Sequence, residues 1–200
     1  MKKCVLRAAA LVIALITAVF CIGSCGNGSA ITEEIKTRPI PEGMTFDDLC
    51  GILSIYGHKV GLPCTMEDII ALDDRISRDP KYSAQFVLST NREASLVYSP
   101  SSGVNGSSYF NTVFLFARDE IYKKDLFAIN GDIKFGSDIS AVRELLGEPI
   151  NTTTTTVFKG VSMDYAFVEG DAALRLSFIS DADNKLCAAT FMYTKWTKVQ

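Results

Sequence analysis

The sequence predicts an α+β fold made of two tandem repeats, each with a β-hairpin, a helix and antiparallel strands. The clearest sign is the stretch Ile129–Pro149, in which a turn, a strand, a helix and a helix stop follow one another. A fainter copy of this order lies at Ile52–Ile76, and strand-like runs follow both copies. One copy of about 70 residues is small for a hydrophobic core of its own, so we expect the two copies to share a core.

The first residues have the composition of an export signal. Lys2, Lys3 and Arg7 form a positive leader, and the 15-residue apolar run Ala8–Ile22 follows it. A run of this length is short for a membrane-spanning helix and typical of a signal-peptide core. We expect residues 1–24 to be removed from the mature protein; an uncleaved anchor helix is the alternative.

The end of this segment carries a more specific motif. Ile22, Gly23, Ser24 and Cys25 resemble the lipobox of bacterial lipoproteins, in which an aliphatic residue and two small residues precede the cysteine. The resemblance covers residues 1–25 and implies cleavage before Cys25 and attachment of a diacylglyceryl group to its thiol. Two acyl chains are enough for stable anchoring to a membrane. The implied location is the bacterial cell envelope, on the extracytoplasmic side of a membrane; an ordinary secretory signal is the competing interpretation.

The mature chain is acidic. Removing residues 1–24 takes away three of the 20 basic residues and none of the 23 acidic ones, which leaves a net charge of −6. This balance argues against a nucleic-acid partner and against adhesion to anionic lipid headgroups. Residues 25–44 show little apolar periodicity and are predicted to form a flexible tether with a reach of roughly 25 Å.

The first repeat is assigned to residues 45–128. Thr45 and Thr65 are each followed three positions later by an aspartate, Asp48 or Asp68, which predicts a capped helix after each threonine. Between these helices, two short strands are expected around a glycine turn. Three strand-like runs follow the second helix, at Ala84–Ser89, Ala94–Tyr98 and Thr112–Ala117.

The second repeat is assigned to residues 129–200. Asn130 and Gly131 have the backbone freedom that a type I′ hairpin turn requires, and Asp132–Phe135 alternates as a half-buried strand does. A junction strand at Ile121–Ile129 is expected to lead into this hairpin from the first repeat.

A helix and further strands are expected after this hairpin. Asp138 is placed to cap the helix, and Gly147 to end it. In one later strand, Arg175 and Ser177 alternate with apolar residues, so one face of the sheet is expected to be solvated or used for binding. The strands are predicted at Thr154–Lys159, Met163–Val168, Ala173–Ile179 and Leu186–Thr194.

This order of elements, twice over, resembles the tandem-repeat lipoproteins related to β-lactamase inhibitor protein, a family that includes the small lipoprotein of the outer-membrane barrel-assembly machinery. Gly136–Pro149 is similar to their pattern of a small residue, a helix and Leu-Gly-x-Pro. The likeness covers roughly residues 50–194 by element order, and the first repeat lacks the Leu-Gly-x-Pro end. It implies a protein-binding sheet surface and brings no catalytic site to this chain.

Three cysteines remain once the signal is removed and Cys25 is lipidated: Cys50, Cys64 and Cys187. Three cysteines cannot all pair, and their spacing matches neither a disulfide framework nor a zinc site. Buried free thiols are therefore expected, with a disulfide between Cys50 and Cys64 as the alternative.

Few residues are candidates for catalysis or metal binding. The single histidine, His58, lies near Cys64 in the sequence, so an envelope enzyme that uses this pair is an alternative function. No cysteine-enzyme motif surrounds either residue, which favours a solvated histidine and a buried thiol. Asp181, Asp183 and Asn184 faintly resemble a calcium loop but lack its glycine and its distal glutamate, so a hairpin turn is expected there. We expect no enzyme, no metal and no cofactor.

The leading interpretation is a lipid-anchored binding or scaffolding module that recognises a protein or peptide partner. Aromatic residues concentrate in the closing strands and are candidates for partner binding if they are exposed on the sheet. A membrane-held inhibitor of a secreted enzyme is a further alternative, for which Ser99–Ser108, predicted as a mobile polar loop, is the candidate element. The aromatic candidates are Tyr165, Phe167, Phe191, Tyr193 and Trp196.

Overall fold

The computed structural model describes residues 36–78, 85–87, 94–102, 108–117 and 127–196. Helices and antiparallel strands are both present, so the α+β class is confirmed. Across the described residues, a sheet of eight strands forms the centre of the compact unit that begins at Thr37. Its strands are β3 (Ser77–Arg78), β4 (Gln85–Val87), β5 (Ala94–Ser102), β6 (Ser108–Ala117), β8 (Asn151–Thr154), β9 (Lys159–Glu169), β10 (Ala172–Asp181) and β11 (Leu186–Trp196).

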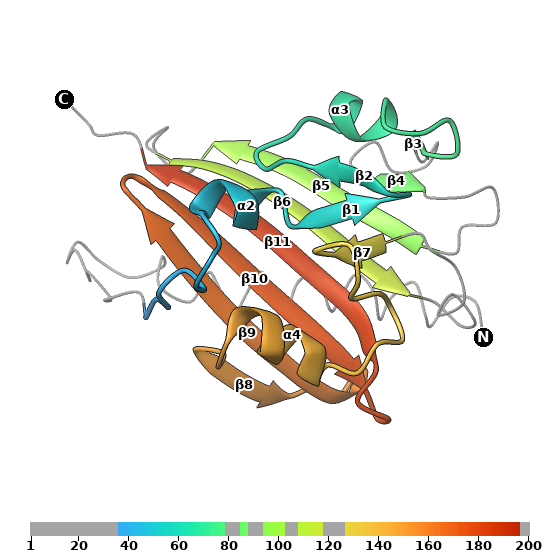
Figure 1. Cartoon of the computed structure of the whole chain (residues 1–200). Coiled ribbons are helices and arrows are strands. Elements are labelled where there is room, and N and C mark those ends of the chain that lie inside the picture. The colour runs from blue at the N-terminus through green and yellow to red at the C-terminus, as the bar shows by residue number, and fades with distance from the viewer. Residues whose placement is uncertain (1–35, 79–84, 88–93, 103–107, 118–126, 197–200) are drawn as a thin grey trace, which may run out of the picture. The chain divides into compact units, whose positions relative to one another are not determined.

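The strand order in this large sheet is β3-β4-β5-β6-β11-β10-β9-β8, and each neighbouring pair is antiparallel (Figure 1). The strands that follow each other in the chain are therefore neighbours within β3–β6 and within β8–β11. The long strands β6 and β11 join these two groups at the middle of the sheet, with Phe191 opposite Val113.

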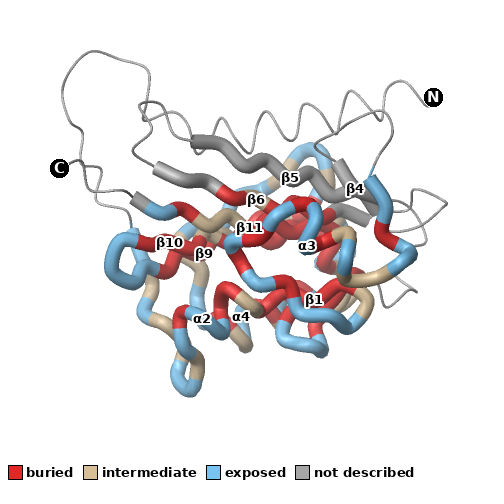
Figure 2. Tube along the Cα trace, turned by 90° about the horizontal axis from the view of Figure 1, so that it is seen from above, coloured by how far each residue is buried: buried red, intermediate tan, exposed pale blue. Residues whose placement is uncertain are grey.

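A small sheet and three described helices lie on one face of the large sheet, as Figures 1 and 2 show. We call this side of the large sheet the core face and the opposite side the outer face. The small sheet has the order β2-β1-β7. Its strands are β1 (Leu53–Ile55), β2 (His58–Val60) and β7 (Phe127–Ile129), and the helices are α2 (Phe46–Cys50), α3 (Met66–Ile70) and α4 (Ser140–Leu146).

Two hairpin turns of the small sheet have nearly identical backbone geometry. Tyr56 and Gly57, between β1 and β2, have φ values of 49° and 82°. Asn130 and Gly131, after β7, have φ values of 50° and 83°. Positive φ at both central residues is the geometry of a type I′ turn, so the turn predicted from the Asn-Gly dipeptide is confirmed.

Helices α2 and α3 begin with the capping boxes that the sequence predicts. The Asp48 N–H donates to Thr45 Oγ1 at 3.1 Å, and the Thr45 N–H donates to the Asp48 carboxylate at 2.8 Å. Thr65 and Asp68 make the same pair of bonds at 3.1 and 2.7 Å. Each reciprocal pair satisfies backbone N–H groups that have no partner inside the helix.

Helix α4 is held differently at its two ends. The Ser140 N–H donates to Asp138 Oδ1 at 3.0 Å, so the expected aspartate contributes, although it does not occupy the N-cap position itself. Gly147 ends the helix with a φ of 78°, a conformation that suits glycine, as predicted. Val142 and Leu146 on the buried side of α4 belong to the core.

Several expected elements differ from the structure. The strand predicted at Thr154–Lys159 is wrong, since β8 ends at Thr154 and a turn leads to β9. Asp132–Phe135 forms no strand; it contributes one isolated bridge between Ile133 and Ile129. The chain there leads toward α4, and Phe135 is buried in the core instead of continuing a strand.

The loop predicted at Ser99–Ser108 is also shorter than expected. Residues 99–102 continue β5, and Ser108 already belongs to β6, so polar composition does not end these strands. Residues 103–107 lie outside the described residues, as do 118–126 of the predicted junction strand. Cross-strand hydrogen bonding along β5 and β6 outweighs the loop preference of serine and glycine.

The described end of the predicted tether is attached to the fold. The Arg38 N–H donates to the carbonyl of Ala166 on β9 at 2.8 Å. Ile40 and Met44 are partly buried against the core. The proposed tether through residue 44 is therefore too long at its C-terminal end, and Cys25 with the signal lies outside the described residues.

Candidate functional site

The outer face is a candidate binding surface because its side chains differ from those of the core face. Side chains alternate between the two faces along a strand. On β10, Leu174, Leu176 and Phe178 lie in the core, which directs Arg175 and Ser177 to the outer face as predicted. Across the part of the chain that the structure describes, no helix packs on this outer face (Figure 2).

A hydrogen-bonded cluster of two serines and one carboxylate lies on the outer face. Ser177 Oγ donates to Asp164 Oδ1 at 2.8 Å, and Ser162 Oγ donates to the same oxygen at 3.3 Å. The two serine oxygens are 3.0 Å apart. Asn151 Nδ2, from the edge strand β8, donates to Asp164 Oδ2 at 3.3 Å. Donors from three strands therefore orient one carboxylate, which becomes a fixed acceptor on this face.

Two further polar groups lie beside this cluster. The Arg175 side chain is half-buried, and its burial lowers the pKa of the guanidinium. Thr190 of β11 is directly opposite Ser177. Its hydroxyl is buried and has no hydrogen-bond partner among the described residues. A buried hydroxyl without a hydrogen-bond partner is rare in folded proteins.

The aromatic residues predicted for partner binding lie mainly in the core. Tyr165, Phe167 and Phe191 are each no more than 1% exposed, so the prediction that they are surface anchors is wrong. The Tyr165 hydroxyl donates to the Gly147 carbonyl at 3.1 Å, which satisfies its polar end. Tyr193 packs against the same core and is partly buried.

The fifth predicted residue, Trp196, ends β11, and its side chain lies outside the described residues. The side chains of the other four point toward the core, because strand side chains alternate and all four occupy core-face positions in β9 and β11. The sequence reveals the alternation but not which of the two faces the helices cover.

Cys64 and His58 are in different environments. Cys64 is buried, and burial raises the pKa of its thiol to about 12. Its N–H donates to Asn111 Oδ1 at 3.1 Å, and Asn111 Nδ2 donates back to the Cys64 carbonyl at 2.8 Å. His58 is exposed on β2. A nucleophilic cysteine needs a lowered pKa and a neighbouring base, so this arrangement is the opposite of an activated thiol.

The other cysteines are also buried free thiols, as expected, and no disulfide joins Cys50 to Cys64. Burial raises the pKa of Cys50 to about 11 and that of Cys187 to about 12. The acidic stretch after β10 forms the predicted turn, in which Asp181 Oδ1 accepts from the Asp183 N–H at 2.9 Å. The same oxygen also accepts from the Lys185 N–H at 2.9 Å, so it bonds the backbone of the turn itself.

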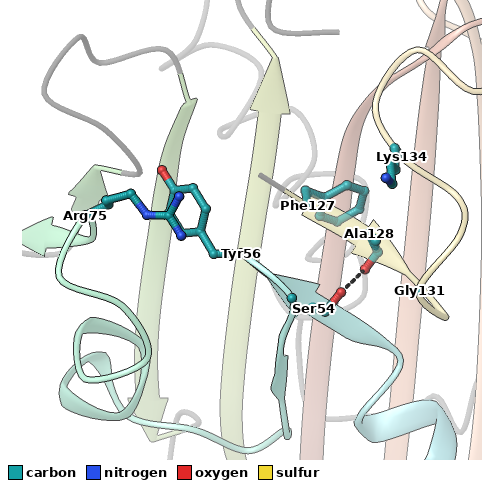
Figure 3. A pocket seen from close by; sticks show the side chains of 8 residues that line it. Ser54, Tyr56, Arg75, Phe127, Ala128, Gly131 and Lys134 are labelled. Carbon is teal, nitrogen blue, oxygen red and sulfur yellow. Dashed lines mark hydrogen bonds between the residues drawn. The ribbon is translucent and has the colours of Figure 1, made fainter. Parts of the chain in front are cut away.

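A cleft of about 430 Å³ opens at the end of the small sheet, between the two hairpin turns (Figure 3). Sequence reasoning identified the turns but not the cleft, because its walls come from segments far apart in the chain. The local pattern in each turn is a residue followed by glycine, Tyr56-Gly57 or Asn130-Gly131, and it indicates the turn but not the cleft. The lining residues are Ser54, Tyr56, Gly57, Arg75, Phe127, Ala128, Gly131 and Lys134.

Comparisons of the chain with protein-family profiles, with curated proteins and with solved structures found no match. The helices of the described residues are all too short or too polar to cross a membrane. Within the same residues, His, Cys, Asp and Glu side chains form no cluster that could hold a metal ion.

Proposed function

We propose that this protein is a lipid-anchored binding or scaffolding module of the bacterial cell envelope, and that it recognises a protein or peptide partner with the outer face of its large sheet. The lipobox-like motif at Cys25 supports the anchor, and the extracytoplasmic side of a membrane is the proposed location. The net charge of the mature chain supports a partner other than nucleic acid. No cofactor and no catalytic residue is part of the proposal.

One observation carries the proposed binding surface. The described helices and the small sheet pack on a single face of the large sheet (Figure 2). The other face carries hydrogen-bonded polar groups, of which Asp164 and Arg175 are partly exposed and Ser162 and Ser177 are buried. Asp164 offers a negative acceptor and Arg175 a cation, and the buried hydroxyls of Ser162 and Ser177 orient the Asp164 carboxylate. Charged and hydroxyl groups held in place give a partner specificity at little cost in ordering.

We also propose that the fold consists of two tandem repeats, as in the lipoproteins that the sequence resembles. The strand order supports this idea, because β3, β4, β5 and β6 run inward from one edge and β8, β9, β10 and β11 run inward from the other. The matching φ values of the two hairpin turns support it too. A continuous outer face spanning both repeats is what a large protein partner would require.

The anchor is tested by replacing its cysteine. Cys25→Ala should leave the precursor uncleaved and abolish its labelling by a fatty-acid analogue in cells of the natural host. Undiminished labelling of the variant would refute the lipobox assignment.

The binding surface is tested by affinity capture from detergent-solubilised membranes of the host. Arg175→Glu should remove a partner that the wild type captures, because it reverses the cation on the outer face. Lys59→Glu is the matched control, since Lys59 is exposed on β2 and the charge change is identical. Equal loss of the partner in both variants would show that net charge rather than the outer face governs capture.

A further inference from the structure

The strand β8, at one edge of the large sheet, lacks the features that usually keep an edge strand from pairing with another chain. Among the described residues, no strand lies beyond it (Figure 1). All four of its residues, Asn151–Thr154, are exposed. Five threonines follow one another at 152–156, and residues 150–157 include no charged residue and no proline. Proteins normally protect an exposed edge with charge, proline, a bulge or a very short strand.

The rest of the edge of the large sheet is protected in these ways. At the opposite edge, β3 is only two residues long, and its Arg78 forms an ion pair with Glu67. On the other side, β9 continues beyond the end of β8, and there the Arg38 N–H bonds the Ala166 carbonyl at 2.8 Å. The contrast shows that β8 is the open part of the edge in the described sheet.

The backbone of β8 directs two residues away from the sheet. The Thr155 N–H donates to the Gly160 carbonyl at 2.9 Å, in register with the pair Thr153–Ser162. Hydrogen-bonded and non-hydrogen-bonded pairs alternate along an antiparallel ladder. Thr152 and Thr154 therefore point their N–H and C=O groups away from β9, toward solvent. These are two donors and two acceptors in the geometry that a further strand requires.

A second copy of β8 is complementary to this edge. If two copies pair antiparallel about a twofold axis at Thr153, the outward groups of Thr152 meet those of the partner's Thr154, and the reverse, which gives four backbone hydrogen bonds. Every residue brought opposite another is uncharged, so no like charges meet, and threonine pairs across strands are favourable. A charged strand of another protein would find no complementary charge on this edge, which favours the second copy as its occupant.

We propose that β8 is a contact between two copies of this chain, which pair edge to edge into one continuous antiparallel sheet. Such a twofold contact uses the same surface on both copies. Thr153 lies opposite Ser162, on the outer face, so the outer faces of the two copies would lie on the same side of the joined sheet. The contact is small, so the dimer is expected to be weak and reversible. It depends neither on the proposed anchor nor on the proposed partner.

Disulfide trapping in host cells tests the contact and its register. At the twofold axis, Thr153 and its counterpart form a non-hydrogen-bonded pair, the closest kind in an antiparallel ladder and near the separation that a disulfide needs. Full-length Thr153→Cys should give a disulfide-linked dimer under mild oxidation. Glu144→Cys, exposed on α4, is the matched control and should give little or none, as should the wild type, whose described cysteines are buried. Equal dimer yields from the two variants, or no dimer from Thr153→Cys, would overturn the proposal.

Charge complementation provides an independent test by sedimentation velocity of the full chain in an excess of detergent micelles. The wild type should form more dimer as its concentration rises. Thr153→Lys and Thr153→Glu should each stay monomeric, because like charges meet at the axis, and Thr153→Gln, the uncharged control, should still form dimers. An equimolar mixture of the Lys and Glu variants should recover the dimer, which also shows that both are folded. A wild type that is monomeric at every concentration, or a mixture no more dimeric than either variant alone, would overturn the proposal.

Discussion

On its core face, the part of the large sheet formed by β9, β10 and β11 carries closely packed rings. The Phe178 ring lies edge-on to those of Tyr165 and Phe191, with centroid distances of 6.0 and 5.9 Å. The outer face of the same strands carries Asp164 and Ser177, joined by a hydrogen bond of 2.8 Å. The comparison teaches that neighbouring positions on one strand separate apolar packing from polar hydrogen bonding, because side-chain direction changes at every residue.

The sharpest test of this division compares two adjacent residues of β10. Phe178→Ala should lower the free energy of unfolding by about 3–5 kcal/mol, since the ring is fully buried and leaves a cavity. Ser177→Ala should cost less, about 1.5–3 kcal/mol, the usual range for a lost hydrogen bond to a charged group. Urea denaturation measures both. Similar losses in the two variants would mean that the outer face is as much a part of the core as the inner one.

A second test sharpens the comparison between the two hairpin turns. Gly131→Val and Gly57→Val should each destabilise the fold by more than about 1 kcal/mol, because a β-branched residue resists positive φ. A Cβ at either position meets nothing within 4 Å, so the expected cost is purely conformational.

Gly61→Val is the control for the turns, since a Cβ there is equally free of contacts and its φ lies outside the left-handed region. Its unfolding midpoint should stay close to that of the wild type. If one turn tolerates valine as well as Gly61 does, the two hairpins are not equivalent.

Much of the fold could be predicted from these local signals, and the burial of the candidate site residues could not. Capping boxes at Thr45 and Thr65 and the Asn-Gly turn are local and specific, so they were recognised directly. Tyr165 and Phe191 alternate correctly, but whether an aromatic position is core or surface depends on which face the helices cover. The cleft needs Arg75 and Phe127, which are far apart in the sequence, to line one space, and no local pattern encodes this.

The helix caps provide a smaller effect. Thr65→Ala should destabilise the protein by about 1 kcal/mol, because the first turn of α3 loses the hydroxyl that accepts from Asp68. Thr153→Ala, an exposed threonine on β8, should change the free energy of unfolding by less than about 0.5 kcal/mol. Thermal unfolding distinguishes the two. No difference between them would show that the cap contributes nothing measurable.

The smallest expected effect is a dependence on pH. Hydrogen bonds from Thr65 hold the pKa of Asp68 below its ordinary value. A carboxylate with a lowered pKa in the folded state contributes stability above its unfolded pKa of about 4 and loses it as the pH falls through the folded value. Asp68→Asn should therefore flatten the fall in urea midpoint below about pH 4. An unchanged slope would contradict the assigned role of this carboxylate.

The proposed use of the outer face is tested most directly by site-specific photo-crosslinking in host cells. A benzophenone side chain placed at position 175, on the outer face, should give a discrete crosslink to a partner protein. The same group at position 144, exposed on α4 on the core-face side of the molecule, should give none or a much weaker one. Crosslinks of equal strength from both positions, crosslinks from position 144 alone, or none from position 175 would contradict the assignment of partner recognition to the outer face.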